Sequence, residues 1–229
     1  MTVPAPFFDD GSITIYRGDS RDILSTLAPA SVDLLLTDPP YGQSYRGRYS
    51  QHRPIAGDGQ AEALPLFAAT LAAAAPLLKP DAHLLVFANA DRWAEFRDVV
   101  VQVAGHRNTL IWHKARGGMG DTSGTYARDY EVIVFAALGR RALRGKRDGS
   151  VLAGYPPPSA RARTHPTEKP VALLERLIDK HTPEGGLVLD PFMGTGSALV
   201  AARNTGRRAI GIELDARYCE VAAERVGKG

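Results

Sequence analysis

The chain has 229 residues, 44% of them hydrophobic and 23% charged, and a net charge of +3 at pH 7. Its length suits one well-packed domain over residues 1–229, and its composition excludes a disordered or collagen-like chain. The net charge is too small to establish nucleic-acid binding, so the distribution of charge matters more than its total. No basic stretch followed by an apolar run begins the sequence, so we expect neither a signal nor a transit peptide, and a cytoplasmic location.

Short runs rich in Val, Ile and Leu alternate with longer segments of helical period. This alternation is typical of an α/β domain with a mostly parallel, doubly wound sheet. We expect seven strands, at residues 12–16, 32–37, 83–88, 108–113, 130–136, 186–190 and 208–212. Helices are expected at residues 21–27, 61–78, 92–103, 171–181, 197–204 and 216–226. The apolar run 61–78 contains Glu62, Pro65 and Pro76, which favours a core helix over a membrane span.

Two segments depart from the alternation. Within residues 110–135, two strand-like runs are joined by a glycine-rich stretch, 117–124, which predicts a β-hairpin and an antiparallel pair at one end of the sheet. Residues 139–164 show no clear periodicity and contain three consecutive prolines. Long irregular segments in compact domains are usually functional or disordered, so we expect a short insertion that contacts the substrate.

Basic side chains concentrate in two stretches. Residues 139–163 contain Asp148 as their single acid, and a smaller basic group follows residue 45. The basic residues of the first stretch are Arg140, Arg141, Arg144, Lys146, Arg147, Arg161 and Arg163, and those of the second are Arg46, Arg48 and Arg53. Each stretch could be a solvated loop, but clustered arginines are also suited to a phosphate backbone.

Residues 187–197 read as a buried strand, a tight glycine turn and the start of a helix. The glycines let a ligand approach the main chain, and the helix N-terminus offers donors to a carboxylate. Glu213 lies 23 positions after Asp190, at the end of the next strand, where it can reach a ribose. A nicotinamide dinucleotide and a purely structural turn both stay open here, although the third glycine of the dinucleotide fingerprint is replaced by Leu199.

Residues 37–42, Thr-Asp-Pro-Pro-Tyr-Gly, directly follow the apolar run 32–36. They therefore lie at the carboxyl end of a strand, where open α/β sheets bind ligands. Two adjacent prolines fix the backbone and remove two N–H donors, while Tyr41 offers a flat face for a base and Asp38 a strong acceptor.

The sequence of residues 190–196, Asp-Pro-Phe-Met-Gly-Thr-Gly, resembles the cofactor loop of the amino-methyltransferases of DNA. Residues 165–170, His-Pro-Thr-Glu-Lys-Pro, and residues 211–215 with Tyr218 resemble the segments that precede and follow that loop. The resemblance implies S-adenosylmethionine as the cofactor, with Asp19 at its adenine, although an ordinary helix N-cap would also explain Asp19. The implied cofactor-binding residues are Asp19, Asp38, Thr167, Lys169, Asp190, Phe192, Gly194, Thr195, Gly196, Ser197, Glu213 and Leu214, with Thr167 and Lys169 near the methionine carboxylate.

The order of the motifs resembles that of the circularly permuted β class, because residues 38–41 precede residues 190–197. This implies a seven-stranded Rossmann-like methyltransferase sheet, mostly parallel with an antiparallel hairpin strand. Asp38, Pro39, Pro40 and Tyr41 are the implied catalytic residues. The Asp38 carboxylate and the Pro39 carbonyl would accept the two hydrogens of an amino group, and the flipped base would stack on Tyr41.

Adenine N6 in DNA is the expected target, because the motif begins with Asp where cytosine-N4 enzymes more often have Ser. The alternatives are an N4-cytosine DNA methyltransferase, an RNA amino-methyltransferase, a dinucleotide-dependent oxidoreductase and a catalytically idle nucleic-acid-binding relative. The six histidines show no paired metal-ligand spacing, so no metal is expected.

Expected DNA contacts are the basic residues of both stretches together with Trp112 and Lys114, whose hairpin resembles the one that encloses the flipped base in the β class. Members that read defined sequences usually carry a larger recognition region than residues 139–164. We therefore hypothesise low sequence specificity, or dependence on the partner in a homodimer.

Overall fold

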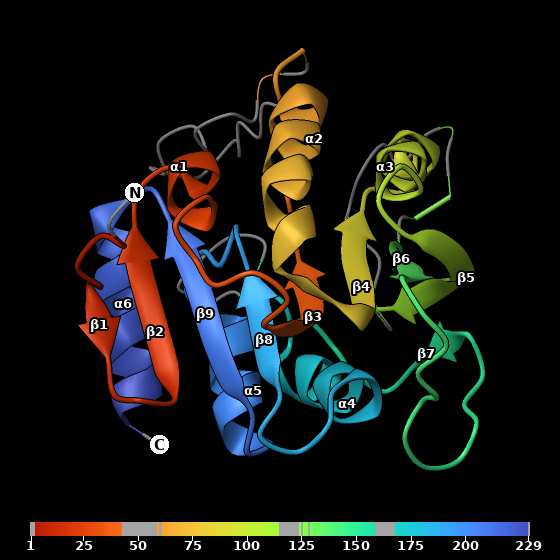
Figure 1. The fold of residues 1–229 in the computed structure, drawn as a ribbon. Coiled ribbons are helices and arrows are strands. Elements are labelled where there is room, and N and C mark those ends of the chain that lie inside the picture. The colour runs from red at the N-terminus through yellow and green to blue at the C-terminus, as the bar shows by residue number, and fades with distance from the viewer. Residues whose placement is uncertain are drawn as a thin grey trace.

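A computed structural model describes residues 3–42, 59, 61–114, 124, 126–127, 129–158 and 168–228. These residues form a nine-stranded sheet in the order β1-β2-β9-β8-β3-β4-β6-β5-β7, with helices on both faces (Figure 1). The strands are β1 (Phe8–Asp9), β2 (Ile13–Arg17), β3 (Val32–Thr37), β4 (Leu78–Ala88), β5 (Gly105–His113), β6 (Tyr130–Ala137), β7 (Val151–Leu152), β8 (Leu187–Asp190) and β9 (Arg208–Glu213). The helices are α1 (Ser20–Leu24), α2 (Ala63–Ala74), the 3-10 turn η1 (Ala75–Leu77), α3 (Trp93–Val100), α4 (Val171–His181), α5 (Ser197–Asn204) and α6 (Ala216–Gly227).

The predicted α/β class is confirmed, but the predicted number of strands was wrong. Two-residue strands, β1 and β7, extend the sheet at its two ends, and such short strands leave no periodic signal in a sequence. The predicted helix 61–78 was also too long. Helix α2 ends at Ala74, and the following turn contains Pro76, whose ring removes a helical hydrogen bond and favours the end of the helix. Within the described residues, no helix is both long and apolar enough to cross a membrane.

The core consists of two layers, one on each face of the sheet. Helices α4, α5 and α6 pack on one face, against Leu34 and Leu36 of β3. Helices α1, α2 and α3 pack on the other face, against Leu35 of the same strand. All six residues of β3 are buried, as expected for a central strand covered on both sides.

The directions of the strands determine which strand ends lie together at each edge of the sheet. Strands β2, β9, β8, β3 and β4 are parallel to one another, so their carboxyl ends share one edge. Strand β6 is antiparallel to both β4 and β5, which confirms the predicted antiparallel pair. The start of β6 and the end of β5 therefore lie at the same edge as the carboxyl ends of the parallel strands. The glycine-rich connection predicted between them lies, except for Gly124, outside the described residues.

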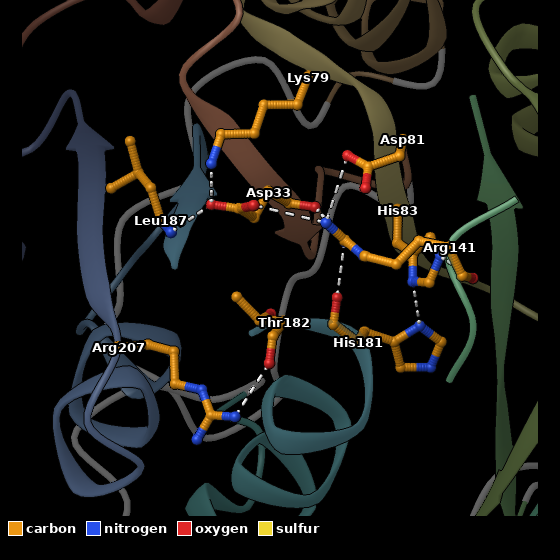
Figure 2. A network of polar contacts seen from close by, with 9 residues as sticks. All are labelled: Asp33, Lys79, Asp81, His83, Arg141, His181, Thr182, Leu187 and Arg207. Carbon is orange, nitrogen blue, oxygen red and sulfur yellow. Dashed lines mark hydrogen bonds and ion pairs between the residues drawn. The ribbon is translucent and has the colours of Figure 1, made fainter. Parts of the chain in front are cut away.

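The opposite edge of the sheet is stabilised by a buried charge network around Asp33 (Figure 2). The Asp33 carboxylate is 4% exposed and accepts hydrogen bonds from Lys79 Nζ at 2.8 Å and from the Leu187 N–H at 2.9 Å. The Arg141 guanidinium lies 3.4 Å from the same carboxylate and donates to the Asp33 carbonyl at 2.7 Å and the His181 carbonyl at 2.9 Å. One carboxylate thus joins β3, β4, β8, the end of α4 and the segment after β6.

A pair of neutral histidines extends this network. His83 Nδ1 lies 3.1 Å from His181 Nδ1, and burial lowers the pKa of His83 to about 4 and that of His181 to about 3. His83 Nε2 lies 3.1 Å from the Arg141 carbonyl, which can only accept, so Nε2 carries the proton of the neutral ring. His83 Nδ1 is then the acceptor of a hydrogen bond donated by His181.

Asp33→Asn should lower the free energy of unfolding by about 2–3 kcal/mol, because Arg141 and Lys79 would keep their charges beside a neutral amide. The matched control is Asp81→Asn, which removes a half-exposed carboxylate 3.7 Å from Arg141 and should cost less than about 0.5 kcal/mol. Urea denaturation measures both variants. Equal losses in the two would contradict a central role for Asp33.

Candidate active site

A cavity of about 1090 Å³ opens at the carboxyl edge of the parallel strands. It is lined by the residues that end β3, by the turn after β8, by the residues that follow β9 and by the start of α1. The sequence motifs at 38–41 and 190–197, far apart in the chain, therefore share one cavity. They meet because β3 and β8 are parallel neighbours in the sheet.

The turn after β8 needs its glycines for two different reasons. Gly196 precedes α5 with φ of 77°, and a Cβ there would lie 2.8 Å from the Ala222 Cβ, so any other residue would be strained and crowded. Gly194 has φ of 51°, and a Cβ there would meet no atom within 4 Å. The backbone at Gly194 therefore borders open space, where a ligand can approach the main chain.

Glu213, at the end of β9, holds this turn in place. Its carboxylate accepts hydrogen bonds from the Gly194 N–H at 3.1 Å and from the Asp215 N–H at 2.8 Å. Burial raises the pKa of Glu213 despite these bonds. Leu214 follows it on the cavity wall and is 55% exposed.

Asp190 joins the ends of the two central strands. Its Oδ1 accepts from Thr37 Oγ1 at 2.9 Å and from the Phe192 N–H at 3.1 Å. The side chain is 6% exposed, and burial raises the pKa of Asp190 to about 7. The tie to Thr37 connects the predicted cofactor turn to the residue that precedes Asp38.

Asp19 lies on the cavity wall and also caps a helix. Its carboxylate accepts from the Arg21 N–H at 2.9 Å and pairs with the Arg21 guanidinium at 2.5 Å. The hydrogen bond from the Arg21 side chain lowers the pKa of Asp19. Asp19 is therefore the N-cap of α1, as the alternative interpretation of the sequence proposed. Asp19 also lines the cavity, so its role at the cofactor's adenine stays a prediction.

Arg225, Glu168 and Ser20, for which the sequence predicted no role, connect the segments that line the cavity. Arg225 of α6 donates to the Thr195 carbonyl at 2.9 Å and pairs with Glu168 at 2.8 Å, which ties the turn to the segment before α4. Ser20 Oγ donates to the Pro191 carbonyl at 2.5 Å. These contacts join residues distant in the sequence and leave no local pattern that could have predicted them.

The residues after β3 present Asp38 to the cavity. One Asp38 oxygen accepts from the Tyr41 hydroxyl, and the other accepts from Lys169 Nζ. The Tyr41 carbonyl accepts from Arg92 at 2.8 Å, and its ring packs edge-on against Phe96 at 5.9 Å between centroids. Contacts therefore fix both the backbone and the ring of Tyr41.

Lys169, expected near the methionine carboxylate of the cofactor, forms ion pairs with carboxylates of the protein. Its side chain is 6% exposed, and its Nζ contacts Asp38 and lies 3.3 Å from Glu131 Oε2. Glu131 in turn pairs with Lys114 Nζ at 2.6 Å. Lys169 lines the cavity, but its charge is engaged by two carboxylates of the protein, and Thr167, its expected companion, lies outside the described residues.

Trp112, expected from the sequence to contact DNA, is not exposed to make such a contact. Its side chain is 1% exposed, and its Nε1 donates to the Tyr155 carbonyl at 2.8 Å. The ring packs edge-on against Phe87 at 6.4 Å between centroids. Trp112 is therefore a core residue. Its neighbour Lys114 is partly exposed and paired with Glu131.

Residues 139–147, the first part of the large basic stretch, lie at the opposite edge of the sheet from the cavity. They follow the end of β6, and because β6 is antiparallel, that end lies beside the amino ends of the parallel strands. Arg141 belongs to the Asp33 network, and Arg144 pairs with Glu184 at 3.0 Å. Arg140, Lys146 and Arg147 are exposed at this edge. The other predicted DNA contacts, Arg46, Arg48, Arg53, Arg161 and Arg163, lie outside the described residues.

Neither a reactive thiol nor a metal centre is found in the described part of the chain. Cys219 is fully buried, and burial raises the pKa of its thiol to about 12, which makes it a structural residue. The described residues include no group of three or more His, Cys, Asp or Glu side chains that could hold a metal ion.

Known proteins that are similar in sequence to this chain are methylases or methyltransferases. Residues 32–224 match the DNA methylase family of N6 and N4 methyltransferases. The putative methylase YubD of Escherichia coli K12 is 36% identical over 214 residues, 92% of this chain and 88% of that protein. The type II methyltransferase M2.DpnII of Streptococcus pneumoniae is 25% identical over 247 residues, 96% of this chain and 92% of that protein.

Solved structures resemble the fold closely. The complex of M1.HpyAVI with S-adenosylmethionine has a TM-score of 0.72 and 25% identity, and the match covers 93% of this chain and 98% of that one. The cytosine-N4-specific PvuII DNA methyltransferase has a TM-score of 0.78 over 96% of this chain and 88% of that one, but only 16% identity, so it shares the fold alone.

Asp190→Asn should make the protein more stable than wild type at alkaline pH, and progressively less so as the pH falls. The folded pKa of about 7 lies above the unfolded value of about 3.9, so ionisation of Asp190 destabilises the fold as the pH rises from about 4 to about 7. Three pKa units correspond to about 4 kcal/mol at pH 8. The amide oxygen can still accept from Thr37 and Phe192. Urea denaturation from pH 5 to pH 8 measures the difference, and a constant difference would contradict the assignment.

Proposed function

The chain belongs to the DNA methylase family of N6 and N4 methyltransferases, which are S-adenosylmethionine-dependent, and on that premise we propose that it methylates the exocyclic N6 amino group of a flipped-out adenine in DNA. The observation that carries the proposal is the shared cavity. Asp38 and Tyr41 line the same cavity as the glycine turn and Glu213. An amino group held by the first pair would face a cofactor held by the second.

The residues present fit S-adenosylmethionine. The open backbone at Gly194 gives the methionine part of the cofactor room to approach the main chain, and Glu213 at the end of β9 is placed for the ribose hydroxyls. Asp19 at the start of α1 offers an acceptor for a purine amino group. When bound, the cofactor supplies an electrophilic methyl group on its sulfonium.

The protein's part in the reaction is to prepare a weak nucleophile. The lone pair of an exocyclic amino nitrogen is delocalised into the base, and acceptors for its two hydrogens restore it. The Asp38 carboxylate and the Pro39 carbonyl are those acceptors. The Tyr41 ring, which packs against Phe96 while Arg92 holds the Tyr41 carbonyl, is the surface on which the base stacks. Positioning and electrostatic complementarity suffice, with no covalent enzyme intermediate.

Adenine is favoured over cytosine by the first residue of the motif. The Asp38 carboxylate is a charged acceptor where cytosine-N4 enzymes more often have a serine hydroxyl. N4-cytosine methylation is the alternative, because the family includes both activities. Membership of the family leaves the dinucleotide-dependent oxidoreductase without support.

We further propose that residues 1–229 form one methyltransferase domain with the permuted motif order of the β class. The segments 43–58 and 159–167 carry Arg46, Arg48, Arg53, Arg161 and Arg163, and they adjoin the cavity-lining residues Tyr41 and Glu168 in the sequence. Those arginines are therefore the proposed phosphate contacts. Residues 139–147 lie at the other edge of the sheet, which supports low sequence specificity or a contribution from a homodimer partner.

Asp38→Ala should reduce methyl transfer to DNA by at least about 100-fold, because it removes the acceptor for an amino hydrogen. S-adenosylmethionine binding, measured by calorimetry, should persist. The matched control is Asp98→Ala at an exposed position, where the carboxylate pairs with its neighbour Arg97, and it should keep wild-type activity.

Mass spectrometry of the nucleosides after reaction with mixed DNA identifies the product. N6-methyladenosine in its deoxy form is expected. N4-methylcytosine would replace the adenine proposal with its alternative, and cofactor binding without any methylated nucleoside would identify an idle relative.

A further inference from the structure

Four charged side chains meet at the cavity wall, and they come from four different parts of the chain. Asp38 follows β3, Glu131 lies near the start of β6, Lys114 follows β5, and Lys169 precedes α4. Lys169 contacts Asp38 directly and lies 3.3 Å from Glu131, while Lys114 lies 2.6 Å from Glu131. Two carboxylates and two ammonium groups balance one another.

Lys169 is the centre of this cluster. Its side chain is almost fully buried, and its Nζ lies 5.1 Å from the centre of the Phe87 ring and 6.0 Å from that of Tyr41. A buried ammonium is costly unless anions compensate it, and Asp38 and Glu131 supply that compensation. Two aromatic rings and two carboxylates surround the ammonium, and together they define the position of the charge.

Lys169 lies closer to Asp38 than to Glu131. Its Nζ donates a hydrogen bond to Asp38 and lies 3.3 Å from Glu131 Oε2, which is buried. Glu131 therefore compensates the buried ammonium as a second anion, and Asp38 is its nearer partner. Glu131 thus helps to keep the Lys169 ammonium in place, and Lys169 donates to Asp38.

Asp38 is held by this lysine in a defined orientation. Lys169 occupies one of its oxygens and the Tyr41 hydroxyl the other. A carboxylate has about four acceptor positions on its two oxygens, so two donors fix its plane and still leave lone pairs for a target amino group. Ionised Asp38 offers them as a charged acceptor, which binds an amino hydrogen more strongly than a neutral carboxylic acid does.

We propose that Lys169 is a positioning residue which, anchored by Glu131, keeps the Asp38 carboxylate ionised and oriented to accept a hydrogen of the target amino group. This inference rests on the proposed amino-methyltransferase function and assigns Lys169 to the catalytic aspartate in place of the cofactor's carboxylate. It also gives Glu131, on the antiparallel hairpin, a part in the reaction.

The charges around Asp38 act in opposite directions. Burial raises the pKa of Asp38, the Lys169 ammonium opposes that rise, and the Glu131 carboxylate adds to it. Burial would also raise the pKa of Glu131, but Lys169 and Lys114 outweigh burial and hold it below its usual value. In the described part of the chain, the Tyr41 hydroxyl and the Asp190 carboxylate also face Asp38, and Asp38 helps to raise the pKa of both.

The test is the acid limb of the pH profile of kcat/KM for methyl transfer to DNA, which reports ionisation of the free enzyme. Lys169→Met should move this limb to higher pH by about one unit or more, because an opposite charge in contact is lost. Glu131→Gln should move it to lower pH, because a like charge is lost. In the double variant, Lys169→Met with Glu131→Gln, activity at neutral pH should exceed that of Lys169→Met alone.

The matched controls repeat the same chemical changes away from the cavity. Lys79→Met removes a lysine at the opposite edge of the sheet, and Glu184→Gln removes an exposed acid. Neither should move the acid limb. Calorimetry of Lys169→Met should give an S-adenosylmethionine affinity within about threefold of wild type, since the lysine serves Asp38.

Four results would overturn the inference. Shifts of the limb in the same direction for both single variants, or a double variant less active than Lys169→Met, would show a merely structural role. A loss of about tenfold or more in cofactor affinity with an unmoved limb would make Lys169 a cofactor ligand. A wild-type protein that methylates no DNA would overturn the proposed function as well, whereas the other three results leave that function intact. If Lys169→Met fails to fold, the direction of the Glu131→Gln shift still decides.

Discussion

Strand β6 runs against its neighbour β4, and this reversal decides which side chains reach the cavity. It brings Glu131, near the start of β6, to the edge where the parallel strands end. It also carries the chain after β6 to the opposite edge, where Arg141 meets Asp33. A parallel strand in the same place would exchange these two positions. The charge cluster at Asp38 and the network that stabilises the far edge therefore both depend on one choice of strand direction.

Each edge of the sheet carries a largely buried carboxylate, and the two carboxylates are compensated in different ways. At each edge a carboxylate is withdrawn from water and compensated by cations from other elements. Asp33 is surrounded by donors on all sides, and its bonds join strands, a helix and a loop. Asp38 is compensated on one side, by Lys169 and the Tyr41 hydroxyl, and borders the cavity on the other. The first arrangement favours stability, and the second keeps acceptor positions available to a substrate.

Hydrogen bonds and an ion pair also connect the proposed cofactor turn with the proposed catalytic motif. Asp190 ends β8, and its hydrogen bond with Thr37 joins the turn to the residue before Asp38. Arg225 ties the same turn to Glu168, the neighbour of Lys169. The residues proposed to bind the cofactor and those proposed to accept the amino hydrogens are therefore held together by direct contacts.

The sequence by itself determined the features that depend on neighbours in the chain. The α/β alternation, the glycine turn before α5 and the rigid Asp-Pro-Pro-Tyr segment after β3 are local, because period and backbone restriction act over a few residues. Only the tertiary structure decided which charges meet. Lys169 pairs with Asp38 and Glu131, the Trp112 ring is buried, and Arg141 lies with Asp33 at the opposite edge of the sheet from the cavity. These outcomes follow from strand order and direction, which bring together side chains that no spacing in the sequence relates.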